Sequence, residues 1–135
     1  MAVVLVVNDD RDMLEVYQAM LGEMGHHAVP RLDLDPDPAN VIETGAEALV
    51  IDLQAEADPI AGLKVIEELR HHPATRNLPI ILSTGAAADV RRLSARLSQL
   101  EVPVLIKPFD IDDFRDVVQR LVPSGGEQGP TPPLS

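Results

Sequence analysis

The sequence predicts an α/β fold in which helices cover both faces of a parallel sheet. Short apolar runs alternate five times with longer segments whose apolar residues recur at helical spacing. In the third run, residues 48–52, four apolar residues lead without a break into Asp52, a composition that suits a strand buried on both faces. Strands that alternate with helices in this way form parallel sheets with right-handed crossovers.

The first two elements are a strand and a helix. Residues 2–7 are apolar and predict a buried strand. Either Asp9 or Asp10 can cap the helix that follows, and Gly25 ends it. The apolar residues that recur along this helix are Met13, Val16, Tyr17, Met20, Leu21 and Met24.

Residues 27–31 predict a second strand, which we place at an edge of the sheet. Pro30 has no N–H for the ladder and would be out of place in a central strand. The composition of residues 32–40 indicates a loop. A short helix that begins at a proline can span residues 38–44, with Gly45 at its end.

The alternation continues after the strand at residues 48–52. An irregular loop runs through Pro59, and a helix is predicted from about residue 61 to residue 72. The apolar residues on one side of this helix are Leu63, Ile66 and Leu69. Residues 79–84 predict another buried strand, whose proline stands at the tolerated first position.

The last third of the chain predicts a helix, a strand and a helix. Asp89 can cap the first of these helices. Residues 102–106 predict the strand, and Pro103 suggests that it forms the opposite edge. The apolar residues of the two helices are Val90, Leu93, Leu97 and Leu100, then Phe114, Val117, Val118 and Leu121.

Prolines in both outer strands fit the strand order 2-1-3-4-5, which is that of a flavodoxin-like doubly wound domain. We expect this domain to span residues 1–122. Seven of the thirteen residues in 123–135 are Pro or Gly, and such a composition predicts a disordered tail or the remnant of a linker.

Composition narrows the function classes. The net charge is −11, which argues against direct nucleic-acid binding because that relies on Lys and Arg to neutralise phosphates. The chain contains no cysteine, which excludes disulfides and thiol chemistry. The apolar start, residues 1–7, is too short for a signal peptide or a membrane span. We therefore expect a cytoplasmic protein without a membrane contact.

Polar residues stand where four of the predicted strands end. They are the segment 8–10, Asp52, the pair 84–85 and the pair 107–108. Four strands that are consecutive in the predicted order share their carboxyl edge, where ligands bind in open α/β sheets. We expect these residues to form one pocket around Asp52.

The residue types suit phosphoryl transfer. Two carboxylates about 4 Å apart repel each other by roughly 4 kcal/mol at an effective dielectric near 20, so they invite a cation. Mg²⁺ accepts such hard oxygen ligands and keeps several waters. A metal on one side and a fixed ammonium on the other stabilise the charge on a phosphoryl group.

On these residues the chain resembles the receiver domain of bacterial two-component response regulators, over nearly the whole of residues 2–122. The resemblance implies that Asp52 accepts a phosphoryl group and that Asp9 binds Mg²⁺. It implies that the backbone carbonyl of Gln54 completes the protein's metal ligands, while Asn8 would reach the metal through water.

The resemblance also assigns the remaining strand-end residues. Lys107 would pair with one phosphoryl oxygen, and the Thr84 hydroxyl would close onto another. Gly85 would let a backbone N–H approach closely. The peptide bond between Lys107 and Pro108 would be cis, as in the family, and would aim the lysine into the pocket.

Each of these residues also has a simpler explanation. Asp9 and Asp10 can be helix caps, Thr84 a hydroxyl at a strand end, and Lys107 a surface charge. Together, in this order and at these strand ends, they favour the receiver interpretation.

Three positions depart from the family pattern. Asn8 stands where the first of two acidic residues is usual. The loop over residues 53–62 is longer than usual, with Pro59 late in it. Val104 stands where an aromatic switch residue is common. These departures bear on Mg²⁺ affinity, on access to Asp52 and on the readout of phosphorylation.

The two histidine pairs and the charges on the fourth and fifth helices give less specific indications of function. The pairs His26–His27 and His71–His72 do not share metal-ligand spacing with other donors, and we expect surface residues near helix C-termini. Charges of opposite sign on the fourth and fifth helices could support a homodimer, although exposed ion pairs contribute little. They are Arg91, Arg92 and Arg96, then Asp112, Asp113 and Asp116.

The leading hypothesis is a signalling switch and not an enzyme with an external substrate. A partner histidine kinase or phosphotransfer protein would phosphorylate Asp52, as in a phosphorelay, and the fourth-helix to fifth-helix face would change. A downstream protein or a missing effector domain would read that face. The alternative is a receiver-like interaction module that works without phosphate. A flavodoxin-like hydrolase or nucleotide binder ranks last because no Gly-rich phosphate loop supports it.

Overall fold

The computed structural model describes residues 2–32, 37–53, 59–85 and 87–122. A five-stranded parallel sheet has the order β2-β1-β3-β4-β5, which confirms the predicted fold class and strand order. The strands are β1 (Val3–Val7), β2 (His27–Arg31), β3 (Ala48–Leu53), β4 (Ile80–Thr84) and β5 (Val104–Ile106). The helices are α1 (Arg11–Glu23), α2 (Pro38–Glu43), α3 (Pro59–His71), α4 (Ala87–Gln99) and α5 (Ile111–Leu121). The predicted tail, residues 123–135, lies outside the described residues.

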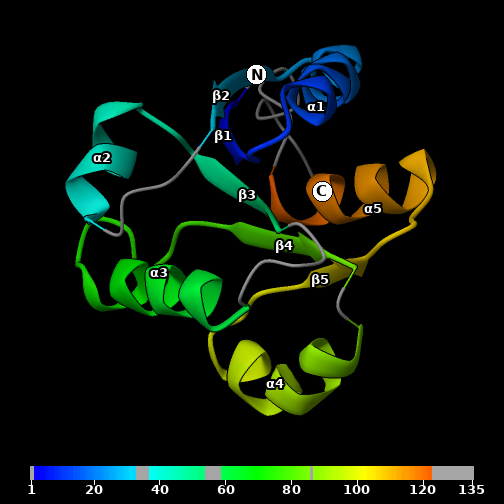
Figure 1. Ribbon diagram of the computed structural model, residues 1–135. Coiled ribbons are helices and arrows are strands. Elements are labelled where there is room, and N and C mark those ends of the chain that lie inside the picture. The colour runs from blue at the N-terminus through cyan, green and yellow to red at the C-terminus, as the bar shows by residue number, and fades with distance from the viewer. Residues whose placement is uncertain (1, 33–36, 54–58, 86, 123–135) are drawn as a thin grey trace, which may run out of the picture.

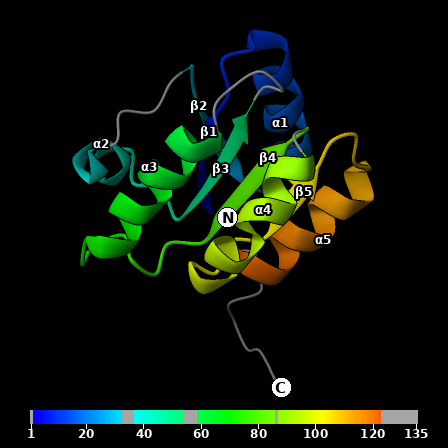
Figure 2. The same cartoon turned by 60° about the horizontal axis from the view of Figure 1, so that its bottom comes forward.

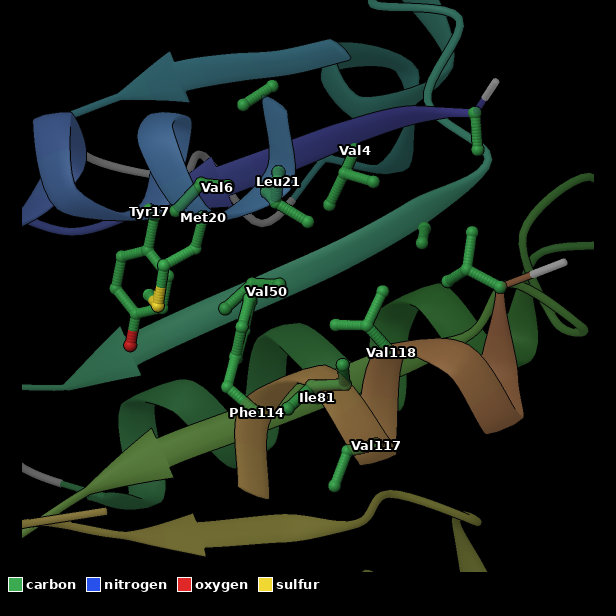
Figure 3. Packing of buried hydrophobic residues seen from close by; sticks show 14 of the residues in the cluster. Val4, Val6, Tyr17, Met20, Leu21, Val50, Ile81, Phe114, Val117 and Val118 are labelled. Atoms are coloured by element: carbon green, nitrogen blue, oxygen red, sulfur yellow. The ribbon is translucent and has the colours of Figure 1, made fainter. Parts of the chain in front are cut away.

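Helices cover both faces of the sheet. Figure 1 shows α1 and α5 on one side and α2, α3 and α4 on the other, and Figure 2 shows the same layers after a turn. We call the apolar cluster under α1 and α5 the α1/α5 layer and the cluster on the opposite face the α2/α3/α4 layer. Figure 3 shows the α1/α5 layer from close by.

Alternation along the strands decides which side chains enter which layer. In β3, Ala48 and Val50 belong to the α1/α5 layer, and Leu49 and Ile51 belong to the α2/α3/α4 layer. Successive residues of a strand point to opposite faces. Asp52 therefore follows Val50 onto the α1/α5 side, at the carboxyl end of the strand.

Helix α1 begins as predicted but buries a slightly different set of residues. The Asp10 carboxylate accepts hydrogen bonds from the backbone N–H groups of Asp12 (2.9 Å) and Met13 (3.4 Å), so Asp10 and not Asp9 is the cap. Val16 is 45% exposed, whereas Leu14, which the periodicity did not single out, is buried. Leu14 therefore takes the place of Val16 on the inner face of the helix, while Met13 and Tyr17 lie on that face as predicted. Gly25 has a φ of +84° after the helix end, a conformation that glycine adopts readily.

The starts of α3 and α4 differ from the prediction, whereas α2 begins at Pro38 as predicted. Helix α3 begins at Pro59, at the first helical position that proline favours, whereas the sequence predicts a loop through Pro59 and a helix from about residue 61. Helix α4 begins at Ala87, so Asp89 lies inside its first turn and is not the cap. Its carboxylate instead pairs with Arg92 at 2.9 Å. A carboxylate in the first turn still complements the helix dipole.

His26 is not the surface residue that the sequence suggested. It is buried, and its Nδ1 accepts a hydrogen bond from the backbone N–H of Ala2 at 3.1 Å. Burial lowers the pKa of His26, while the Glu47 carboxylate acts in the opposite direction. The imidazole therefore accepts a hydrogen bond from the backbone just before β1. The position of His26 after α1 does not predict this contact.

Arg70 joins the end of α3 to the two chain segments that precede β4 and β5. Its guanidinium donates to the carbonyl oxygens of Leu78 (2.6 Å), Leu100 (2.8 Å) and Arg76 (3.2 Å). A rigid fork of five N–H donors can satisfy several carbonyls at once. These hydrogen bonds fix the position of the chain where β4 and β5 begin. The opposite ends of these two strands carry predicted site residues.

Candidate functional site

Asp52 lies at the carboxyl end of β3, the central strand of the sheet, which is flanked by β1 and β4. The residue is 4% exposed. Its Oδ1 forms an ion pair with Nζ of Lys107, and its Oδ2 accepts a hydrogen bond of 2.6 Å from the Tyr17 hydroxyl. A buried carboxylate requires such partners because desolvation of an unpaired charge is costly. Both oxygens of Asp52 thus have a partner inside the protein.

Lys107 reaches this carboxylate because β5 delivers it to the same edge. Its backbone N–H donates to the carbonyl oxygen of Thr84 at 2.9 Å, continuing the pairing in which Ile106 lies opposite Thr84. The Lys107–Pro108 peptide bond is cis, as the resemblance implied. The lysine side chain is 25% exposed. The interpretation of Lys107 as a mere surface charge is therefore wrong.

Asn8 and Asp9 follow β1 at the same edge. The register pairs Val7 with Ile51, so the chain leaves β1 beside the end of β3. Asn8 is buried, and its Oδ1 accepts the backbone N–H of Asp10 at 3.1 Å. Asp9 is exposed and, unlike Asp10, does not cap α1. The first turn of the chain after β1 thus leaves Asp9 at the rim.

Thr84 and Gly85 end the neighbouring strand. Thr84 is buried and lies opposite Leu53 in the β3–β4 register, and Gly85 is exposed. The backbone carbonyl predicted as a metal ligand belongs to Gln54, which lies outside the described residues, as does the rest of the segment 54–58. The roles assigned to these residues in phosphoryl transfer stay predictions.

Tyr17 contacts Asp52, whereas the apolar pattern of the first helix predicts only a core residue at this position. The residue is fully buried, and its ring packs on Phe114 with centroids 5.3 Å apart. Burial raises the pKa of Tyr17 strongly, and the charge and hydrogen bond of Asp52 raise it further, while Ser83 acts in the opposite direction. One signal was available: a buried tyrosine hydroxyl usually has a polar partner, and this is the only tyrosine in the chain.

The carboxylate oxygens at this edge are of the type that a hard cation binds. Asp9 and Asp52 leave neighbouring strands at one edge and supply carboxylate oxygens, which Mg²⁺ prefers. An ionised carboxylate offers about four lone-pair sites, so Asp52 keeps acceptor capacity beside Lys107 and Tyr17. Within the described parts of the chain, no group of three or more His, Asp or Glu residues could hold a metal alone. Two carboxylates with retained waters suit Mg²⁺ better than an all-protein cage.

Several charged side chains of α4 and α5 already form ion pairs or hydrogen bonds within the chain. Arg96 pairs with Glu67 at 2.7 Å, and Arg115 pairs with Asp112 at 3.4 Å. The Asp113 carboxylate accepts the backbone N–H of Asp110 at 3.4 Å. A homodimer through this face stays a prediction.

Two further observations concern the rest of the molecule. A pocket of about 410 Å³ lies between α1 and the end of β2, and Arg11 and Arg31 contribute to its lining. Its lining contains none of the predicted site residues. Across the described ranges, every helix is too short or too polar to cross a membrane.

No protein-family model and no curated protein sequence matches the chain. Solved structures do match its fold. The response regulator protein TrrA from Thermotoga maritima, in complex with Mg²⁺ and BeF, is 24% identical, with a TM-score of 0.64 over 90% of this chain and 100% of that one. The chemotaxis protein CheY4 from Vibrio cholerae is 20% identical, with a TM-score of 0.68 over 90% and 99%.

A third similar structure is the receiver domain of a sensor histidine kinase from Pseudomonas aeruginosa PAO1. It is 22% identical, with a TM-score of 0.65 over 89% of this chain and 96% of that one, and a magnesium ion is coordinated in its active-site cleft. At these identities the likeness concerns the fold. The chain has the fold of response-regulator receiver domains.

Proposed function

We propose that this chain is a phospho-accepting receiver domain of a two-component response regulator. A histidine kinase or phosphotransfer protein would phosphorylate it on Asp52. One observation carries the proposal. The buried carboxylate of Asp52, at the carboxyl end of the central strand, forms an ion pair with Lys107, which directly follows the edge strand β5. Phosphoryl transfer to a carboxylate requires a fixed nucleophile and a cation close to it, and Asp52 and Lys107 provide both.

The chemistry follows from the two partners of the ion pair. An oxygen of Asp52 attacks the phosphorus of the donor, and the bond between phosphorus and the donor breaks. Its electron pair goes to the imidazole nitrogen when the donor is a phosphohistidine, and to the acetate oxygen when the donor is acetyl phosphate. Lys107 neutralises Asp52 in the resting state and can follow the negative charge onto the phosphoryl oxygens. We expect the Thr84 hydroxyl and the backbone N–H at Gly85 to bind those oxygens as well. The domain turns over no external substrate in this scheme.

Mg²⁺ would be held by Asp9 and Asp52, with the Gln54 carbonyl as a further ligand and Asn8 acting through water. The ion would supply positive charge to the phosphoryl oxygens in addition to that of Lys107. Two receiver-fold structures similar to this chain, from Thermotoga maritima and Pseudomonas aeruginosa, contain magnesium, and this supports the assignment. Asn8 carries no charge, so we expect weaker Mg²⁺ binding than two acidic residues would give.

Phosphorylation of Asp52 would change the surface formed by α4, β5 and α5, and a partner protein would recognise that change. Val104 is only half-buried, and Ile106 and Ile111 are 42% and 54% exposed. Exposed aliphatic side chains at the end of β5 and the start of α5 suit contact with a protein partner. A downstream protein or an effector domain would bind this face when Lys107 and Thr84 move toward a phosphoryl group on Asp52.

Intact-mass spectrometry after incubation with Mg²⁺ and acetyl phosphate tests the proposal. We expect the mass of one phosphoryl group to be added to the wild-type protein and not to the Asp52→Asn variant. Asp112→Asn is the matched control, because it removes an exposed carboxylate on α5 and should load normally. If the wild-type protein gains no adduct with excess donor, the alternative of a phosphate-independent interaction module is favoured.

A further inference from the structure

Tyr17 reaches the predicted phosphoacceptor from inside the protein. Its hydroxyl donates to Oδ2 of Asp52 at 2.6 Å, while Lys107 pairs with Oδ1. In Figure 3 the hydroxyl oxygen, in red, is directed toward the arrowhead of β3. The packing of the ring on Phe114 in the α1/α5 layer fixes this direction.

We propose that Tyr17 is a positioning residue that stabilises the free carboxylate of Asp52 and thereby shortens the lifetime of the phosphorylated state. The inference rests on the proposed function of Asp52. It goes beyond that function because it assigns the rate of signal loss to a residue on α1, which contributes none of the residues predicted to contact phosphate or metal.

The reason is the change in charge on the acceptor oxygen. In the free carboxylate, Tyr17 donates to an anion. In the phosphorylated form one carboxyl oxygen is bonded to phosphorus and the other is a neutral carbonyl. Hydrogen bonds to a charged acceptor are roughly twice as strong as those between neutral groups. Tyr17 therefore stabilises the carboxylate more than the acyl phosphate.

The same difference acts on hydrolysis. The oxygen of a water molecule attacks phosphorus, the bond between phosphorus and the Asp52 oxygen breaks, and its electron pair returns to the carboxylate. The water supplies a hydroxyl to the released phosphate, and its remaining proton passes to phosphate or solvent. Negative charge grows on the carboxylate as the bond breaks, so the Tyr17 hydroxyl stabilises the leaving group. In the loading reaction it stabilises the resting nucleophile instead.

The variant Tyr17→Phe isolates the hydroxyl, because a phenylalanine ring keeps the contact with Phe114. The protein is loaded with acetyl phosphate, the donor is removed, and loss of the adduct is followed by intact mass. We expect loss about five-fold slower than in the wild-type protein, equivalent to about 1 kcal/mol in the barrier, and loading that is no slower. Met20→Leu is the matched control, since it changes the same helix and layer without touching Asp52, and its adduct should decay at the wild-type rate.

A second measurement reads the contact without phosphorylation. The chain contains one tyrosine and no tryptophan, so near-ultraviolet absorption and fluorescence above the phenylalanine range come from Tyr17. We expect Asp52→Asn to give a tyrosine-type difference spectrum, because an amide oxygen is a weaker acceptor than a carboxylate. Loading the wild-type protein should change the spectrum in the same direction. Met20→Leu should leave it unchanged.

The outcomes separate the inference from the function on which it rests. If the wild-type protein forms no adduct, the proposed function fails and the inference fails with it. An adduct whose decay is unchanged or faster in Tyr17→Phe overturns the inference alone, as does slower loading of that variant. Identical tyrosine spectra for the wild-type protein and Asp52→Asn also overturn it, and they do so even if Tyr17→Phe does not fold.

Discussion

Replacing Lys107 with methionine should destabilise the folded protein more than replacing Asp52 with asparagine. Removing one partner of a fully buried ion pair costs about 3–5 kcal/mol, because the other charge stays buried. The side chain of Asp52 is 0% exposed and that of Lys107 is 25% exposed, so water can replace part of the ammonium. We therefore expect a cost of about 2 kcal/mol for Lys107→Met.

Asp52→Asn should cost less than about 1 kcal/mol, because it removes the buried charge and Lys107 can extend into water. In the double variant Lys107→Met, Asp52→Asn no charge remains in the pocket. We expect it to be more stable than Lys107→Met alone, which corresponds to a coupling of about 1–2 kcal/mol between the two positions.

Urea unfolding followed by circular dichroism measures all four proteins under one condition, and the midpoints and slopes give the free energies of unfolding. The reasoning is refuted if Asp52→Asn destabilises as much as Lys107→Met. Strict additivity in the double variant would also refute it, since it would mean that the two side chains do not depend on each other.

Three further predictions concern Arg70, His26 and Asp9. Arg70→Ala should lower the free energy of unfolding by about 2–3 kcal/mol, because three carbonyls lose a charged donor; an Arg70→Lys variant that recovers full stability in urea would contradict this. Burial lowers the pKa of His26 from its ordinary value of 6.5, so the unfolded chain takes up the proton first as the pH falls. Stability should be complete above pH 6.5 and decline below it, by less in His26→Gln, and equal slopes for the two proteins between pH 7 and pH 5 would refute the assignment. Asp9→Asn should reduce the rate of phosphoryl loading at limiting Mg²⁺ by about ten-fold or more, whereas an unchanged Mg²⁺ dependence would exclude Asp9 as a ligand.

Much of the site could be predicted because strand ends are a local property of the sequence. The apolar runs identify the strands, and the prolines at positions 30 and 103 mark the outer ones. Because the predicted strands are parallel, Asp52 and Lys107, at the ends of two of them, belong to the same carboxyl edge. The prediction was wrong where a neighbouring residue fits the pattern equally well: Leu14 is buried in place of Val16, and α4 begins two residues before Asp89.

The sequence by itself determined the order of elements, the sheet topology and the set of polar residues at the carboxyl edge, because each depends on periodicity or on residue types that are close together in the chain. Only the tertiary structure decided which polar groups are paired in the interior. Tyr17 and Asp52 are 35 positions apart, and the packing of α1 on this face of the sheet brings them together. His26 likewise finds its partner, Ala2, across 24 positions. A hydrogen bond in the core depends on the position of two side chains within about 3 Å, and no pattern within a single element specifies that distance.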